Sequence, residues 1–272
     1  MNVARKLENL KSRLNRSERM PAVFLGHGNP MYALGNNEYS DSWTALGRAL
    51  PRPQAILLIS AHWMTRGTTL VDVSAMPPTI HDFHGFPQEL YDQSYPAPGH
   101  PELAREVVSM LASHNAAEDD TWGLDHGSWA VLKWLYPEAD LPVFQLSIDM
   151  TRPLDWHLET GAILSDLRDR GVLILGSGNI VHNLKTIAPG ADAFDWAQEF
   201  DANFAEHLAD GNVEALADRA VMGGLFDQAH PSFDHYVPSL VIAGAAHKSD
   251  TLSFMNESID AGSIAMRSFI YS

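Results

Sequence analysis

The sequence predicts an α/β protein: a single domain with a mostly parallel central sheet flanked by helices, and an active site at the carboxyl ends of the strands. Short apolar runs recur along the 272 residues, and stretches with helical character separate most of them. Strands that alternate with helices favour a parallel sheet covered on both faces. Several of the runs meet histidines in turn-forming sequence, and open α/β sheets bind their ligands at that edge.

The strands are predicted from apolar or β-branched runs of strand length that are bounded by turn-forming residues. Six runs qualify, over residues 22–26, 55–61, 68–73, 142–148, 172–177 and 238–244. Helices are predicted over residues 41–49, 100–114, 127–136, 153–170, 194–209 and 212–220. Pro101 and Pro153 stand where two of them begin, a position that tolerates proline, and Gly171 follows the end of one. Residues 74–99 are rich in proline and aromatic side chains, so a functional loop such as a lid or pocket wall is expected there.

The composition excludes several classes of protein. The net charge is −16, and an acidic body repels nucleic acid and anionic lipid, so neither is expected as a partner. The apolar runs are also far shorter than the roughly 20 residues of a membrane span. Since the chain has no cysteine, any metal must be held by His, Asp, Glu or water. A cytoplasmic location is the expectation.

The first residues differ in charge from the rest of the chain. Residues 1–20 carry six basic and two acidic side chains, against 12 and 32 in the remainder. Residues 1–19 are therefore expected to form a basic N-terminal extension ahead of a catalytic domain over residues 20–272. The helical spacing of Leu7, Leu10 and Leu14 fits a short helix on the surface or at a subunit contact, which leaves a homo-oligomer open. A frayed appendage is the other reading.

Four histidines stand beside apolar runs. His27 follows the first run within Gly-His-Gly-Asn-Pro, His62 follows the second, His182 follows a Gly-Ser-Gly-Asn turn, and His235 precedes the run 238–244. Each alone also fits a plain turn or strand-end histidine bonded to the backbone. Together they can converge at one sheet edge, and neutral imidazole is the commonest protein metal ligand. The sequence therefore predicts a mononuclear metal site in an enzyme.

The other histidines have weaker contexts. His126 precedes a helical segment and has Asp125 as its neighbour, but a histidine in a capping loop would look the same. His81 and His84 lie in the aromatic loop and are expected to belong to a pocket wall. Surface or packing positions are expected for the remaining six: His100, His114, His157, His207, His230 and His247.

Ordered motifs over about residues 20–270 resemble those of aromatic ring-opening dioxygenases of the extradiol class III type, specifically the 4,5-DOPA dioxygenase branch. The motifs are Gly26-His-Gly-Asn-Pro30, Ser60-Ala-His-Trp63, Pro77-Pro-Thr-Ile-His-Asp-Phe83, Gly85-Phe-Pro87, Tyr95-Pro-Ala-Pro-Gly99, Trp122-Gly-Leu-Asp-His-Gly-Ser-Trp129, Gln145-Leu-Ser-Ile-Asp149, Gly176-Ser-Gly-Asn-Ile-Val-His-Asn183 and Asp234-His-Tyr236. So many motifs in one order make the resemblance specific. It does not extend to residues 1–19.

The resemblance implies one divalent metal ion per chain, held by His27, His62 and His235, with His182 close enough to be a fourth ligand. Family members are described with zinc, whereas ring cleavage by O₂ is expected to use iron. The best-known relatives complete a set of two His and one carboxylate with Glu. Here the matching segment offers His235 beside Asp234, so an all-histidine set is expected. All-nitrogen ligation suits zinc and the carboxylate-containing set suits iron oxygenases, which leaves Zn²⁺ or Fe²⁺ as the working ion.

The resemblance also implies a reaction and a substrate class. A catechol such as L-DOPA would bind together with O₂, and its ring would open beside the two hydroxyls to give a muconic semialdehyde. His126 and His182 are the implied acid/base residues, since imidazole titrates near neutrality. Arg66 and Lys185 are candidates for holding the carboxylate of an amino-acid substrate.

Two other functions remain open at this point. One is a zinc-dependent hydrolase on the same architecture, in which water activated by the metal is the nucleophile. The other is a metal-binding protein that uses the pocket for recognition without turnover. Oxygen uptake with a catechol separates the dioxygenase from both.

Overall fold

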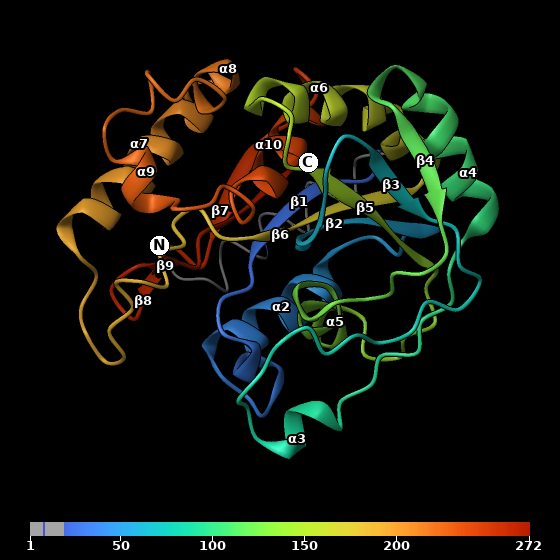
Figure 1. Ribbon diagram of the computed structural model, residues 1–272, viewed down its shortest axis with the longest axis horizontal. Helices are drawn as coiled ribbons and strands as arrows, with labels where there is room; N and C mark the ends of the chain where they lie inside the picture. Colours follow the sequence, from blue (N-terminus) through green and yellow to red (C-terminus); the bar gives the residue numbers. More distant parts are fainter. Residues whose placement is uncertain (1–7, 9–18) are drawn as a thin grey trace.

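The computed structural model describes Glu8 and residues 19–272. A central β-sheet lies between two layers of helices (Figure 1). The sheet contains β1 (Ala22–Gly26), β2 (Ala55–Thr65), β3 (Thr69–Asp72), β4 (Ala116–Asp119), β5 (Val143–Asp149), β6 (Val172–Gly178), β7 (Leu252–Met255) and β10 (Ser268–Tyr271). Its order is β4-β3-β5-β2-β6-β1-β10-β7. A separate pair consists of β8 (Ile259–Asp260) and β9 (Ile264–Ala265).

The four central strands run in one direction. β1 and β2 both pair in parallel with β6, and β2 also pairs in parallel with β5. β1, β5 and β6 are buried along their whole length, as expected for parallel strands covered on both faces. Antiparallel pairs occur toward the edges, between β3 and β5 and between β10 and β1. The predicted single domain with a mostly parallel sheet is confirmed, and the carboxyl ends of the central strands meet at one edge.

Helices cover both faces of the sheet (Figure 1). They are α2 (Glu38–Ala49), α3 (Gln88–Tyr91), α4 (Pro101–Met110), α5 (His126–Leu135), α6 (Leu154–Leu164), α7 (Asp195–Ala209), α8 (Val213–Leu216), α9 (Phe226–Ala229) and α10 (Val237–Gly244), with 3₁₀ turns η1 (Pro30–Ala33), η2 (Ala112–His114) and η3 (Ser165–Arg170). One apolar core joins the sheet to α4, α6, α7 and α10, and a second joins it to α2 and α5.

The prediction of a strand over residues 238–244 is wrong, because these residues form α10. The segment is buried almost throughout, so it shows no polar face and no periodicity that would separate a buried helix from a buried strand. Pro238 lies in the first turn, where a helix tolerates it. α10 packs closely against α6: a Cβ on Gly161 would stand 2.0 Å from the carbonyl oxygen of Val241, and one on Gly244 would stand 2.0 Å from that of Leu158.

Several helices and strands begin or end at other residues than the sequence predicts. α2 begins at Glu38 because Asn37 and Ser40 form a reciprocal capping box. The predicted helices 100–114 and 153–170 each end in a 3₁₀ turn, and helix 212–220 shortens to α8. β2 continues past residue 61 through a bulge between Ile59 and Met64. The short strands β4, β7 and β10 were not predicted, and the polar β4 lies at an edge of the sheet.

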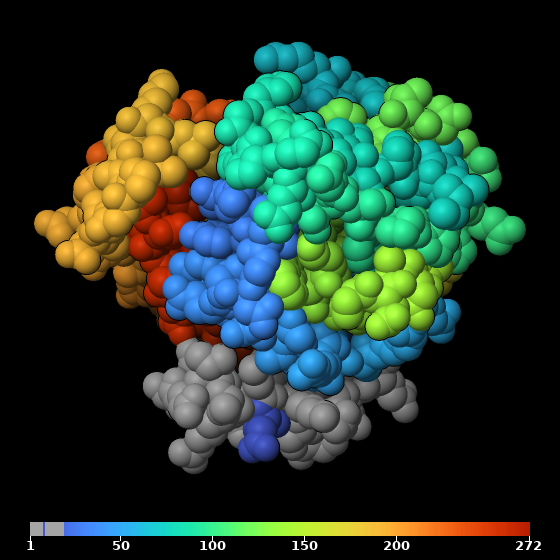
Figure 2. Space-filling view, turned by 90° about the horizontal axis from the view of Figure 1, so that it is seen from below, coloured from blue at the N-terminus to red at the C-terminus, as the bar shows by residue number. Residues whose placement is uncertain are grey.

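The aromatic segment 74–99 is a long loop that contains only the short helix α3. Figure 2 shows the turquoise part of the chain, to which this loop belongs, as an outer layer beside the blue residues that follow residue 20. The proposed extension over residues 1–19 lies outside the described residues except for Glu8 and Arg19, and the Arg19 guanidinium lies 2.6 Å from the Asp169 carboxylate. Among the described helices, none has the length and apolar character needed to cross a membrane.

Candidate metal centre

Three histidines from separate parts of the chain meet beside the carboxyl end of β6. His27 directly follows β1, His62 lies in the bulge of β2, and His235 lies between α9 and α10. The end of β6 holds two of them, since its Gly178 carbonyl accepts from the His27 N–H and the following Asn179 N–H donates to the His235 carbonyl. A Cβ on Gly178 would stand 2.2 Å from that carbonyl oxygen, so the close approach requires glycine.

The three side chains offer nitrogen atoms that all lie within 4.8 Å of one another. The Nε2 atoms of His27 and His62 are 3.3 Å apart. The ring centroids of His27 and His235 are separated by 5.2 Å, and those of His62 and His235 by 5.0 Å. Two of the three rings are buried and that of His62 is 18% exposed, so the cluster opens to solvent on one side only.

The Nδ1 atom of each imidazole lies near a hydroxyl or carboxylate oxygen of the protein. His235 Nδ1 donates to the Asp234 carboxylate at 2.7 Å. His27 Nδ1 lies 3.0 Å from the Ser177 hydroxyl, which itself donates to the Gly127 carbonyl and so must accept from the imidazole. His62 Nδ1 lies 3.4 Å from a carboxylate oxygen of Asp82. The rings of His27 and His235 therefore carry their proton on Nδ1 and leave Nε2 as a lone pair, and the negative charge of Asp82 favours the same tautomer for His62.

The electrostatics of the cluster keep these imidazoles neutral. Burial, together with the neighbouring histidines, holds the pKa of His27 and of His235 well below the ordinary value. Burial lowers the pKa of His62 to about 3, with the adjacent His126 adding to the effect. Neutral imidazole is the form that binds metals, so the site is held ready for a cation at neutral pH.

The donor set fits a metal ion. The Nε2 atoms of His27 and His62 lie 3.3 Å apart, close enough to share one cation. Zinc holds nitrogens at roughly 2.0–2.1 Å in tetrahedral geometry, which places neighbouring ligand atoms about 3.3 Å apart. Histidines that bind a metal through one ring nitrogen usually have a hydroxyl, carbonyl or carboxylate beside the other nitrogen. The three imidazoles of the cluster have this arrangement, with one hydroxyl and two carboxylates. The cluster is therefore able to bind a metal.

His126 and Asp82 adjoin this cluster. His126 is the first residue of α5, and its ring centroid lies 3.9 Å from that of His62. Both its backbone N–H and its Nδ1 donate to one oxygen of Asp82, at 2.8 and 2.9 Å. Although burial acts to raise it, these hydrogen bonds from His126 hold the pKa of Asp82 below its ordinary value.

His182 approaches the cluster from the loop after β6. Its ring stacks on that of His235 with a centroid distance of 3.4 Å and an angle of 4° between the planes. Its backbone N–H donates to the carbonyl of Ala229. Burial lowers the pKa of His182 to about 4. The structure therefore brings all five sequence-predicted site histidines together.

Aromatic residues of the loop 74–99 pack beside His126 and α5, and their role as a pocket wall stays a prediction. Phe83 is buried and its ring centroid lies 5.5 Å from that of His126, while His81 packs 5.7 Å from Trp129. His84 is exposed instead. Elsewhere, His100 caps α4, and the histidines expected at surface or packing positions include three that are buried: His114, His157 and His230.

Sequence reasoning missed two of the residues that orient the histidines. Ser177 stands inside the Gly-Ser-Gly turn, and the small residues of that turn were the available signal. Asp82 stands in the loop motif Ile80-His-Asp-Phe83, where nothing in the spacing indicates a contact with a histidine 44 residues later. Asp234 was noted beside His235 and lies at its Nδ1.

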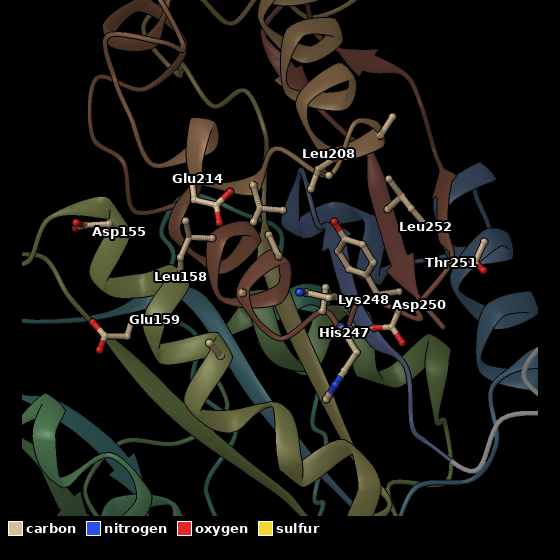
Figure 3. Close-up of a pocket in the computed structure, with 18 of the residues that line it drawn as sticks. Asp155, Leu158, Glu159, Leu208, Glu214, His247, Lys248, Asp250, Thr251 and Leu252 are labelled. Atoms are coloured by element: carbon tan, nitrogen blue, oxygen red, sulfur yellow. Dashed lines mark hydrogen bonds between the residues drawn. The ribbon is translucent and has the colours of Figure 1, made fainter.

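A separate cavity of about 1020 Å³ lies between α6, α8, α10 and β7 (Figure 3). Figure 3 shows Glu159, Glu214 and Lys248 around it, with Leu158 and Leu252 providing apolar surface. None of the clustered histidines lines this cavity. The cavity is therefore separate from the histidine cluster.

Comparisons with known proteins show the family to which the chain belongs. Residues 21–265 match the family described as the catalytic LigB subunit of aromatic ring-opening dioxygenase. The 4,5-DOPA dioxygenase extradiol of Escherichia coli K12 is 46% identical over 93% of this chain and 94% of its own length, and that of Beta vulgaris is 36% identical over 90% and 94%. The crystal structure of an uncharacterized protein from Escherichia coli K12 superposes with a TM-score of 0.82 at 42% identity, covering 93% of this chain and all of that one. The chain belongs to the LigB family of extradiol ring-opening dioxygenases.

Proposed function

We propose that the protein opens the ring of a catechol with O₂, beside the two hydroxyls, to give a muconic semialdehyde, and that L-DOPA is the first substrate to test. The relatives named 4,5-DOPA dioxygenase support this substrate. One structural observation carries the proposal: three Nε2 lone pairs converge next to a further imidazole, His126, that a carboxylate orients. Both oxygen atoms of O₂ enter the product, one in the aldehyde and one in the new carboxyl group.

His27, His62 and His235 are the proposed ligands of one divalent ion. Zinc suits three nitrogens, but it has no redox chemistry, so Fe²⁺ is the ion proposed for turnover. When bound, the ion supplies Lewis acidity that lowers the pKa of the catechol hydroxyls and, as iron, a redox-active centre for O₂. The protein supplies everything else that the reaction needs.

His126 is the proposed general base and acid. Because Asp82 accepts from its Nδ1–H, the Nε2 atom of His126 carries a lone pair that can take a proton from a catechol hydroxyl. The same nitrogen can later return the proton to an oxygen of the opening ring. A contribution of this kind is typically worth roughly 10²–10⁴-fold in rate.

His182 has two possible roles, a fourth ligand or a second acid/base. Its face-to-face stacking on His235, and its absence from the group of three whose nitrogens meet, favour the second role. A neutral His182 would then accept or return a proton from its position stacked on His235. Metal content of a His182→Ala protein distinguishes the two roles.

The aromatic wall would hold the ring of the substrate. Phe83 stands beside His126 and contacts Phe86 and Tyr91, with centroid distances of 5.3 and 5.1 Å. These rings offer apolar surface to a catechol and keep water from the reacting face. Holding of the substrate carboxylate by Arg66 or Lys185 stays a prediction, as do the cytoplasmic location and a homo-oligomer.

The decisive experiment is anaerobic loading of the purified protein with Fe²⁺, followed by an oxygen-electrode assay with L-DOPA and a panel of catechols. We expect one O₂ consumed per catechol and a yellow ring-opened product, whereas zinc-loaded protein should bind catechol but turn over poorly. No oxygen uptake with any catechol, together with hydrolysis of an ester or amide, would refute the proposal. The hydrolase alternative is not favoured, because the family and its relatives are ring-opening dioxygenases.

A further inference from the structure

Asp82 contacts two histidines that have different proposed tasks. One carboxylate oxygen accepts from both the backbone N–H and the Nδ1 of His126, at 2.8 and 2.9 Å. The other oxygen lies 3.4 Å from Nδ1 of His62. The side chain of Asp82 is only 16% exposed, so solvent competes weakly for these contacts.

Main-chain pairing brings Asp82 to this place. Thr79 and Leu124 form a parallel bridge, in which the Leu124 N–H donates to the Pro78 carbonyl and the Ile80 N–H donates to the Leu124 carbonyl, at 2.8 and 2.7 Å. Ile80 is two residues before Asp82, and Leu124 is two residues before His126. The loop and the start of α5 are therefore held in register immediately before the contact.

Two further contacts hold the loop on either side of Asp82. The indole N–H of Trp129 donates to the Ile80 carbonyl at 2.9 Å. Phe83, the next residue, is buried and lies against His126 and Trp129. Asp82 thus stands between two anchored residues, and its carboxylate is presented to the N-terminus of α5, where the helix dipole favours an anion.

We propose that Asp82 is a positioning residue that fixes the tautomer of both His62 and His126, and so couples metal binding to proton transfer. The part of this inference that concerns proton transfer by His126 rests on the proposed function. A carboxylate only accepts hydrogen bonds, so Nδ1 of His126, which bonds to it at 2.9 Å, carries a proton. The negative charge of the other oxygen, 3.4 Å away, favours a proton on Nδ1 of His62 as well. Nε2 of His62 is thereby left free for the metal, and Nε2 of His126 for the substrate proton.

Asp82 could alternatively be a ligand itself, because His62, Asp82 and His126 also offer donor atoms within 4.8 Å of one another. The hydrogen bonds argue against this arrangement. A cation between these three would have to displace the His126 Nδ1–H from the carboxylate oxygen that it contacts at 2.9 Å. A cation between His27, His62 and His235 would leave the contacts of their Nδ1 atoms with Ser177, Asp82 and Asp234 in place. It would bind through their other ring nitrogens.

Replacing the carboxylate by an amide tests the tautomer argument. In Asp82→Asn the amide oxygen should face the two donors of His126, because the amide N–H₂ would clash with both. The amide N–H₂ then faces Nδ1 of His62 and requires a lone pair there, which moves the His62 proton to Nε2 and opposes the metal. Asp82→Ala removes the acceptor without adding a donor, so it should harm metal binding less and release His126 more.

The experiment measures Zn²⁺ affinity of the metal-free full-length protein by competition with a chromophoric chelator, per folded molecule, and kcat at saturating Fe²⁺. We expect Asp82→Asn to weaken Zn²⁺ binding by roughly 10–100-fold, the usual effect of losing an outer partner, and Asp82→Ala to weaken it less. At saturating Fe²⁺, kcat should fall further in Asp82→Ala than in Asp82→Asn. Asp92→Asn, the same change at an exposed position of the same loop, is the control and should match the wild type.

Two results would overturn the inference. One is an Asp82→Asn protein that binds Zn²⁺ as tightly as Asp92→Asn. The other is abolished Zn²⁺ binding in Asp82→Ala while His27→Ala retains it, which would make Asp82 a ligand. If the wild-type protein binds Zn²⁺ but consumes no O₂ when loaded with iron, the proposed reaction is refuted. The Zn²⁺ affinities of the Asp82 variants would still test whether Asp82 orients His62.

Discussion

Replacing His62 by Ala should weaken metal binding by about two orders of magnitude while the fold survives. Structural zinc sites with four ligands bind with apparent free energies of roughly 10–16 kcal/mol, or roughly 3 kcal/mol per ligand. Since about 1.4 kcal/mol corresponds to a factor of ten, loss of one nitrogen should raise the Kd about 10²-fold. His62 is the most exposed of the three proposed ligands and its ring contacts the other site histidines, so its loss leaves the two apolar cores intact.

The measurement is metal content after dialysis, with a chelator titration for the Kd and thermal unfolding of the metal-free protein. His84→Ala, the same substitution at an exposed histidine of the aromatic loop, serves as the control. The metal-free His62→Ala protein should unfold at about the same temperature as the wild type, because the substitution changes no residue of either apolar core. Near-stoichiometric metal with an unchanged Kd would refute the assignment of His62 as a ligand.

Three further predictions concern proton transfer, helix packing and pH. His126→Ala should keep its metal and lose turnover by roughly 10²–10⁴-fold in steady-state assays, and unchanged turnover would leave it only a structural role. Gly161→Ala should lower the free energy of unfolding by roughly 1–3 kcal/mol in denaturant titrations, because its Cβ would stand 2.0 Å from the carbonyl oxygen of Val241; equal stability would mean that α6 and α10 have room to separate. Burial lowers the pKa of His157 to about 4, so between about pH 6.5 and 4 the unfolded chain binds this proton first and stability falls as pH falls, by about 1.4 kcal/mol per pH unit. His157→Gln should show a correspondingly shallower slope over that window.

The central sheet could be predicted from local sequence because its strands carry their own signals. β1 matches its predicted bounds, and β5 and β6 match within one residue, since each is an apolar run with turn-forming residues at its ends. Pro101 likewise marks the start of α4. The run 238–244 had no such signal. It is buried on all sides, and in the folded protein it forms α10, which Gly161 and Gly244 allow to pack closely on α6.

Part of the candidate metal site could likewise be predicted from sequence, and part could not. His27, His62 and His182 could be singled out from sequence, because the direction of parallel strands delivers the loops after them to one edge. His235 was singled out beside a run that forms α10, and it reaches this edge through the hydrogen bond of its carbonyl with the Asn179 N–H. The outer contacts depend on side chains that are distant along the chain, so spacing carries no information about them. Asp82 meets His126 only because the loop before it pairs with Leu124, and that pairing is a property of the folded backbone. Local patterns thus indicated which histidines are candidate ligands, whereas the tertiary structure decided which of their nitrogen atoms lie close together.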